Sequence, residues 1–121
     1  EAPAVEYKEL SSDEPAESSQ AIRERVLAAR KLQHERFAAK SKCRANAEMT
    51  HGLLKTYCKL DLEGRELLHR AMEELHLSAR AYDRILKVSR TIADLAASPR
   101  ICPPHLLEAI QYRTLDRNFW H

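Results

Sequence analysis

The sequence predicts an all-α fold, a bundle of five helices that follows an extended acidic leader. Only two of the 121 residues are glycine, which is too few for glycine-rich phosphate loops or a hairpin-rich β structure. Alanine, leucine, glutamate, lysine and arginine dominate the chain, and all five favour helix. Several segments place apolar residues at the three- and four-residue spacing of a helix face. Hydrophobic residues make up 44% of the chain, enough for the core of one domain.

The first 18 residues are expected to form an extended leader and linker. They hold six acidic residues and one lysine, a net charge of −5, so that residues 19–121 carry +7 of the total of +2. Residues 11–19 are rich in serine, glutamate and aspartate without helical periodicity, which is typical of a linker. The basic helical domain over 19–121 suits phosphates or an acidic protein surface, and an ordinary solvated surface is the alternative.

Three helices are expected before residue 76. The first runs from about Ser19 to about Lys40, with Leu32 at the margin of an apolar side formed by Ile22, Val26, Ala29 and Phe37. A basic connector over 40–46 follows. The second helix covers 51–58, with Thr50 as its N-cap and a buried side formed by Leu53, Leu54 and Tyr57. The third covers 62–75, with Asp61 as its N-cap and an apolar face of Leu68, Ala71, Met72 and Leu75.

The fourth helix is the longest and the most regular. Ser78 is its expected N-cap, and Ser98-Pro99 ends it because proline disfavours helical geometry in the residue before it. Its apolar side is formed by Tyr82, Ile85, Leu86, Ser89, Ile92, Ala93 and Ala96. Its opposite side carries Arg80, Arg84, Lys87 and Thr91. The fifth helix starts at Pro103-Pro104, packs Leu106, Leu107 and Ile110 inward, and gives way to a tail over 112–121.

Arg80 breaks a local rule, because it falls in the first turn of the fourth helix. A cation there faces the positive end of the helix dipole. A phosphate would resolve this conflict, since helix N-termini and guanidinium groups both attract phosphate. Arg80 is therefore a candidate phosphate-binding residue, and an ion pair with Glu74 or Asp83 is the alternative. Asp94 is expected to pair with Arg90, one turn earlier.

Other kinds of site are not indicated. The three cysteines, Cys43, Cys58 and Cys102, form no CxxC pair, which favours reduced thiols packed in a cytoplasmic protein and no metal site. No apolar run is long enough to cross a membrane, and no signal peptide is visible, so no membrane partner is expected. Acids and histidines are scattered, so no catalytic residue is expected. Without a starting Met, the chain is expected to be a piece of a longer protein.

Several motifs in fixed order resemble a known family. They are Glu17-Ser18-Ser19-x-x-Ile22-Arg23, Asn46-Ala47, Cys58-x-Leu60-Asp61, Leu77-Ser78-Ala79-Arg80-Ala81-Tyr82, Arg84-Ile85-Leu86-Lys87-Val88-x-Arg90-Thr91-Ile92-Ala93-Asp94-Leu95 and Gln111-Tyr112-Arg113-x-Leu115-Asp116-Arg117. Together they resemble the C-terminal domain of magnesium-chelatase-like AAA+ ATPases of the ComM subfamily, over roughly residues 2–120. This resemblance implies a helical lid that follows an upstream AAA+ core of the same chain.

The resemblance also implies a role for named residues. Arg80 matches the sensor-2 arginine, which contacts the γ-phosphate of ATP, while Arg84 and Lys87 are candidates for contacts with phosphate or a neighbouring subunit. ATP and Mg²⁺ are the expected cofactors of the longer protein. No GxxxxGK[ST] motif occurs in these 121 residues, so this chain alone is not expected to hydrolyse ATP.

The resemblance implies a hexameric ring that acts on DNA, by branch migration during recombination in competence. Two alternatives remain open. One is a subunit of an ATP-driven magnesium chelatase. The other is an autonomous helical module that binds DNA or protein, with DNA contacts from Arg23, Arg30, Lys31, Lys40, Lys42 and Arg44.

Overall fold

The structure, a computed structural model, describes residues 17–38 and 42–120, with side chains up to residue 113. Every regular element in these ranges is helical, as predicted. The α-helices are α2 (Ser19–Arg36), α3 (His51–Tyr57), α4 (Leu62–Leu75), α5 (Ala79–Leu95) and α6 (Pro103–Trp120), and a short 3-10 turn, η1 (Asn46–Glu48), precedes α3. The predicted acidic leader lies outside the described residues except for its last two.

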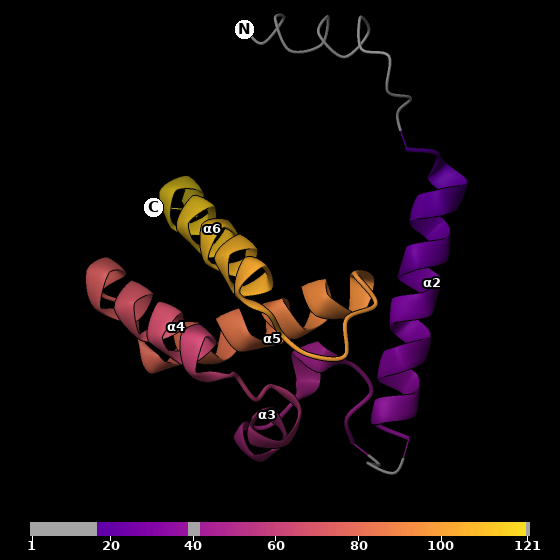
Figure 1. The fold of residues 1–121 in the computed structure, drawn as a ribbon, viewed down its shortest axis with the longest axis horizontal. Coiled ribbons are helices and arrows are strands. Elements are labelled where there is room, and N and C mark those ends of the chain that lie inside the picture. Colours follow the sequence, from indigo (N-terminus) through magenta and orange to yellow (C-terminus); the bar gives the residue numbers. More distant parts are fainter. Residues whose placement is uncertain (1–16, 39–41, 121) are drawn as a thin grey trace, which may run out of the picture.

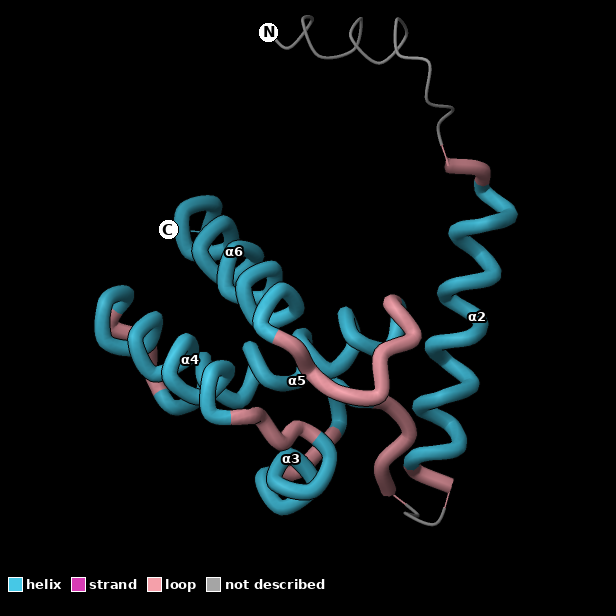
Figure 2. The backbone as a smooth tube through the Cα atoms, in the orientation of Figure 1, coloured by secondary structure: helices cyan, strands magenta, loops and turns pink. Residues whose placement is uncertain are grey.

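Helix α5 is the centre of the molecule. It packs against α2, η1, α3 and α6, while α4 packs against α6. Figure 1 shows α4 and α6 toward one end of α5 and α2 beside the other end. The tube in Figure 2 shows that the loop between α5 and α6 turns the chain back along α5. The N-terminal part of α2 extends beyond the other helices, so α2 contacts the body through its later turns.

Side-chain caps begin four of the helices, as the local sequence requires. In each case a backbone N–H of the first turn donates to a side-chain oxygen of the residue before the helix. The predicted caps Thr50, Asp61 and Ser78 are confirmed. The donor–acceptor distances are 3.0 Å for Ser18, 3.3 Å for Thr50, 2.7 Å for Asp61 and 3.2 Å for Ser78.

The core lies where α4, α5 and α6 meet. Leu68, Ile85 and Leu106 are its largest fully buried apolar side chains, and all three were expected to pack inward. Three other expectations are wrong. Ile22 is 44% exposed because the start of α2 has no neighbour among the described helices, Leu107 is 47% exposed on the outer side of α6, and Ala96 is exposed at the end of α5.

Two predicted helix ends also differ from the structure. Helix α2 stops at Arg36 rather than near Lys40, because Phe37 leaves the helix and becomes buried with its ring edge-on to Tyr57, 5.6 Å between centroids. Helix α6 continues to Trp120, whereas the sequence predicts a tail from residue 112. No glycine or proline interrupts 105–120, so the chain contains nothing there that would stop a helix.

No helix in the described part of the chain combines the length and the apolar character needed to span a membrane.

Candidate functional site

Arg80 lies in the first turn of α5 and is exposed. The Ser78 hydroxyl accepts from the N–H of Ala81, and no acidic residue occupies this first turn. Neither Glu74 nor Asp83 lies within ion-pair distance of the Arg80 guanidinium, and Asp83 instead lies 3.7 Å from Nδ1 of His51. Among the described residues, Arg80 is therefore an unpaired cation at the positive end of a long helix.

Arg84 and Lys87 share the side of α5 that carries Arg80, but their surroundings differ. Arg84 is exposed and has no ion pair with a described residue. Lys87 is half-buried, and its amine donates to the carbonyl oxygen of Ala47 at 3.3 Å. One turn later the Thr91 hydroxyl accepts from the amide of Asn46 at 3.1 Å. The basic side of α5 therefore has exposed guanidinium groups at its start, whereas its later residues contact η1 and the residues beside it.

The far end of α5 contains a buried carboxylate shared by three side chains. Asp94 is 2% exposed. Arg36 of α2 donates to both oxygens of Asp94, at 2.8 and 2.9 Å. Arg90 approaches the same carboxylate at 3.2 Å, and the Asn46 amide donates to it at 2.8 Å. A bidentate pair of this kind fixes both the distance and the angle between the Arg36 guanidinium and the Asp94 carboxylate, so it holds α2 in place against α5.

The Asp94 carboxylate and its burial affect the two arginines that contact it. Hydrogen bonds to Asp94 raise the pKa of Arg36, although burial of the guanidinium opposes the shift. Arg90 is buried. Its Nη2, which approaches Asp94, also donates to the carbonyl oxygen of Ser98 at 2.9 Å, and its Nη1 donates to that of Pro99 at 3.3 Å. The pairing of Asp94 with Arg90 is the one that the sequence predicts. Arg36 was missed, because 58 positions separate it from Asp94 and no local pattern connects them.

The cysteines are free thiols, and Cys43 and Cys58 are buried in the core as expected. Burial raises the pKa of Cys58 to about 11, which keeps this thiol protonated at neutral pH. Within the described part of the chain, no three His, Cys, Asp or Glu side chains are grouped so that they could hold a metal ion.

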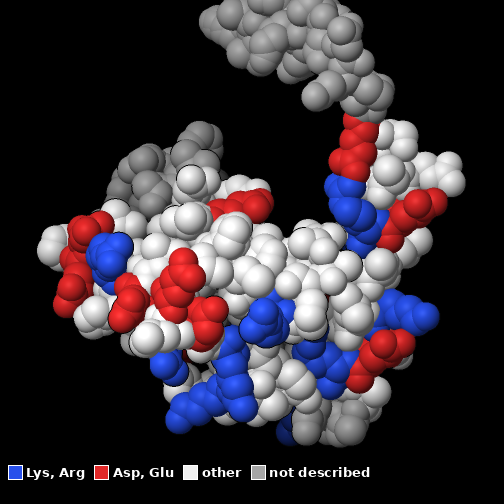
Figure 3. All heavy atoms as spheres, in the orientation of Figure 1, with Lys and Arg blue, Asp and Glu red and all other residues white. Residues whose placement is uncertain are grey.

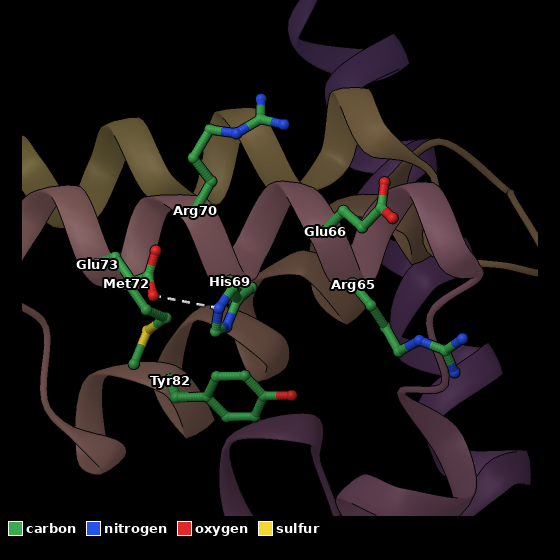
Figure 4. Close-up of a pocket in the computed structure, with 7 residues that line it drawn as sticks. All are labelled: Arg65, Glu66, His69, Arg70, Met72, Glu73 and Tyr82. Atoms are coloured by element: carbon green, nitrogen blue, oxygen red, sulfur yellow. Dashed lines mark ion pairs between the residues drawn. The ribbon is translucent and has the colours of Figure 1, made fainter.

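Two neighbouring cavities flank Tyr82 and Arg65. One has a volume of about 880 Å³ along α4 and carries charges of both signs, including the pair between His69 and Glu73 at 3.3 Å. Figure 4 shows Arg65 extending from α4 toward the side where the Tyr82 hydroxyl points, while Arg70 turns the opposite way. The other cavity, of about 480 Å³, lies between α3, the start of α4 and α5.

Comparisons with known proteins identify a family and several relatives of this chain. The family model described as "Magnesium chelatase, subunit ChlI C-terminal" matches residues 16–113. Competence protein ComM of Haemophilus influenzae is 44% identical over 101 residues, which cover 84% of this chain and 19% of that protein. An uncharacterized protein YifB of Escherichia coli is 40% identical over 107 residues, 88% of this chain and 20% of its own length.

The YifB protein of Salmonella typhimurium is 39% identical over 105 residues, which cover 87% of this chain. The matched region amounts to about a fifth of each of these relatives. The family model covers most of the chain, from the end of the leader into α6 as far as residue 113. This chain therefore belongs to the magnesium chelatase family, as a C-terminal domain of the ComM-like type.

Proposed function

We propose that this chain is the lid domain of a ring-forming AAA+ ATPase, with Arg80 as its sensor-2 arginine. In this role the Arg80 guanidinium contacts the terminal phosphate of a nucleotide that the upstream core holds. The observation that carries the proposal is the exposed, unpaired Arg80 in the first turn of α5. Helix N-terminus and guanidinium attract the same anion, so a phosphate would relieve an arrangement that is unfavourable without one.

Helix α5 also connects the proposed phosphate contact of Arg80 to helix α2. Helix α5 has 17 residues, and at 1.5 Å per residue it is about 25 Å long. Arg80 lies at one end, and Asp94, which binds Arg36 of α2, lies at the other. Helix α2 is the first described helix and follows the leader. Gain or loss of the phosphate contact would therefore move α5 and α2 together relative to the core.

ATP and Mg²⁺ are the cofactors proposed for the longer protein. A free guanidinium at a helix N-terminus fits a nucleotide phosphate, and the exposed Arg84 is available beside it. Lys87 is less available, because its amine already donates to Ala47. The described residues offer no ligand cluster for Mg²⁺. We therefore assign the metal ligands to the upstream core and to the nucleotide.

We propose DNA as the substrate of the motor, within a cytoplasmic hexameric ring. The support is the similarity to a relative named as a competence protein. The family description names magnesium chelatase instead, which keeps ATP-driven metal insertion as the second candidate. ATP turnover of the full-length protein separates the two, because a DNA motor should hydrolyse ATP faster when DNA is added. Turnover that DNA leaves unchanged would argue for the second candidate.

Replacement of Arg80 by alanine in the full-length protein tests the sensor-2 role. We expect ATP turnover to fall by roughly 100-fold, the typical loss for one donor to a reacting group. The thermal unfolding midpoint should stay within a degree or two, because Arg80 is exposed and unpaired among the described residues. Arg70→Ala is the matched control, since Arg70 is an exposed arginine on α4. Unchanged turnover in Arg80→Ala would remove Arg80 from this role.

A further inference from the structure

The 480 Å³ cavity between α3, the start of α4 and α5 is surrounded by cations, and we refer to it as the basic cavity. Lys55, Lys59 and Arg65 line it together with His51, and Asp83 is its one acidic lining residue. In Figure 3 basic side chains gather over α3, while acidic side chains gather along α4, whose first turn carries Glu63. This volume lies within the range of small-ligand sites.

The cations of this cavity lack partners in the described part of the chain. Neither Lys55, Lys59 nor Arg65 lies within ion-pair distance of a carboxylate there, whereas Arg36 and Arg90 share Asp94. Lys55 occupies the last turn of α3, which the helix dipole favours. No such reason applies to Arg65, which is the fourth residue of α4 and lies near the positive end of that helix.

The lining between these cations is apolar. Leu54 and Leu86 contribute hydrophobic surface, and the half-buried Tyr82 adds an aromatic ring. Cys58 is also part of the lining, and its thiol stays neutral because burial raises its pKa to about 11. A ligand that suits this surface combines several negative charges on one group with a flat, weakly polar part. A phosphate can engage two or three cations at once, which a single carboxylate does less well.

We propose that the basic cavity binds one nucleotide unit, with the phosphate on Lys55, Lys59 and Arg65 and the base against Tyr82 and Leu86. The unit could belong to a free nucleotide or to a single strand of nucleic acid, because both present the same phosphate and ring. Arg80 does not line this cavity. The inference therefore stands apart from the sensor-2 proposal and can be tested on this chain without any ATPase activity.

Titration of the ¹⁵N-labelled 121-residue chain tests the inference directly. The probes are ADP without metal, a short oligothymidylate, inorganic phosphate and a glutamate-rich peptide. We expect ADP or the oligothymidylate to shift the amide signals of 55–60, Arg65 and Tyr82 selectively. Shifts with ADP and none with the oligothymidylate would indicate that the cavity binds a free nucleotide. Much tighter binding of the oligothymidylate than of ADP would indicate that it binds a single strand. Selective shifts with the glutamate-rich peptide and none with either nucleotide probe would overturn the proposal in favour of an acidic protein partner.

A pair of double variants locates the binding. Lys55→Gln with Lys59→Gln should weaken binding of the effective probe at least about tenfold. Lys31→Gln with Lys42→Gln is the matched control, because both lysines are exposed outside the cavity. Both double variants should melt like the unmodified chain, since all four side chains are exposed. Equal weakening by the two pairs would show diffuse attraction to the basic surface and would overturn the site.

Salt dependence provides an independent measure if the oligothymidylate is the tighter probe. A single neutralised phosphate predicts a slope of log affinity against log salt of about −0.7, whereas diffuse attraction to several phosphates would give a steeper slope. If instead all four probes leave the amides of 55–60 and Tyr82 unmoved at millimolar concentration, the basic cavity binds no nucleotide.

Discussion

Arg36 lies on α2, Arg80 and Arg90 lie on α5, and the surroundings of the three charges differ. Arg90 is buried and Arg36 is largely covered, and both donate to Asp94, whereas Arg80 is exposed without a described partner. Burial of an unpaired charge is costly, so the two covered arginines require the carboxylate. Arg80 avoids that cost by exposure, and its free donors remain available to a ligand.

Cys58 supplies a prediction on pH. Its pKa is about 11 in the folded chain against an ordinary value of 9.0, because burial disfavours the thiolate. Below pH 9 both states keep the proton and the shift has no effect. From about pH 9 to about pH 11 the unfolded chain ionises first, so the free energy of unfolding should fall, by at most about 3 kcal/mol.

Denaturant melts at several pH values check this, with Cys58→Ala as the reference. All other groups are the same in the two proteins, so their effects cancel in the comparison. The chain with Cys58 should therefore lose stability more steeply than Cys58→Ala over this interval. Parallel curves would mean that the surroundings of Cys58 do not oppose its ionisation.

At the scale of elements, the position of α2 depends on the contacts of Arg36 with α5. Replacement of Asp94 by alanine leaves Arg36 and Arg90 without their carboxylate, so we expect a loss of about 3–5 kcal/mol in the free energy of unfolding. Arg36→Ala should cost less, about 1.5–3 kcal/mol, because Asp94 keeps Arg90 and Asn46. Denaturant melts measure both losses, and hydrogen exchange should show α2 amides opening faster in Arg36→Ala.

Arg25→Ala is the matched control for the link between α2 and α5. Arg25 lies on the same helix and pairs with Glu17, but both side chains are exposed. Exposed pairs contribute roughly 0–1 kcal/mol. An Asp94→Ala chain no less stable than Arg25→Ala would show that the buried carboxylate does not fix α2.

Helix starts were easier to predict than helix ends. Thr50, Asp61 and Ser78 cap their helices through hydrogen bonds within three residues, so the local sequence is sufficient. The ends depend on distant residues. Helix α2 stops at Arg36 because Phe37 leaves it to pack against Tyr57. The predicted end of α4 at Leu75 is confirmed, although His76 follows it in the left-handed region, with φ of 53°. The glycine at position 64 also depends on a distant residue, because a Cβ there would lie 3.2 Å from the Leu106 side chain on α6.

At the scale of the whole molecule, the fold class followed from composition and periodicity, but the candidate sites followed only in part. Arg80 was found because it breaks a rule within its own helix. The basic cavity was not found, because Lys55, Arg65 and Tyr82 come from three helices and share no spacing in the sequence. Periodicity assigns a residue to a side of one helix, whereas a cavity depends on how several helices pack.

The core shared by α4, α5 and α6 should dominate the stability of the whole chain. Leu68 and Ile85 are each 1% exposed, so truncation to alanine removes buried methyl groups and leaves a cavity. We expect Leu68→Ala and Ile85→Ala each to lower the free energy of unfolding by about 2–5 kcal/mol. Leu62→Ala is the control, because Leu62 lies on α4 but is 62% exposed, and it should change stability by less than about 1 kcal/mol. Denaturant melts of the three variants measure the loss in the free energy of unfolding for each. Similar losses in all three would mean that the helices do not share one packed core, since burial would then no longer govern the cost.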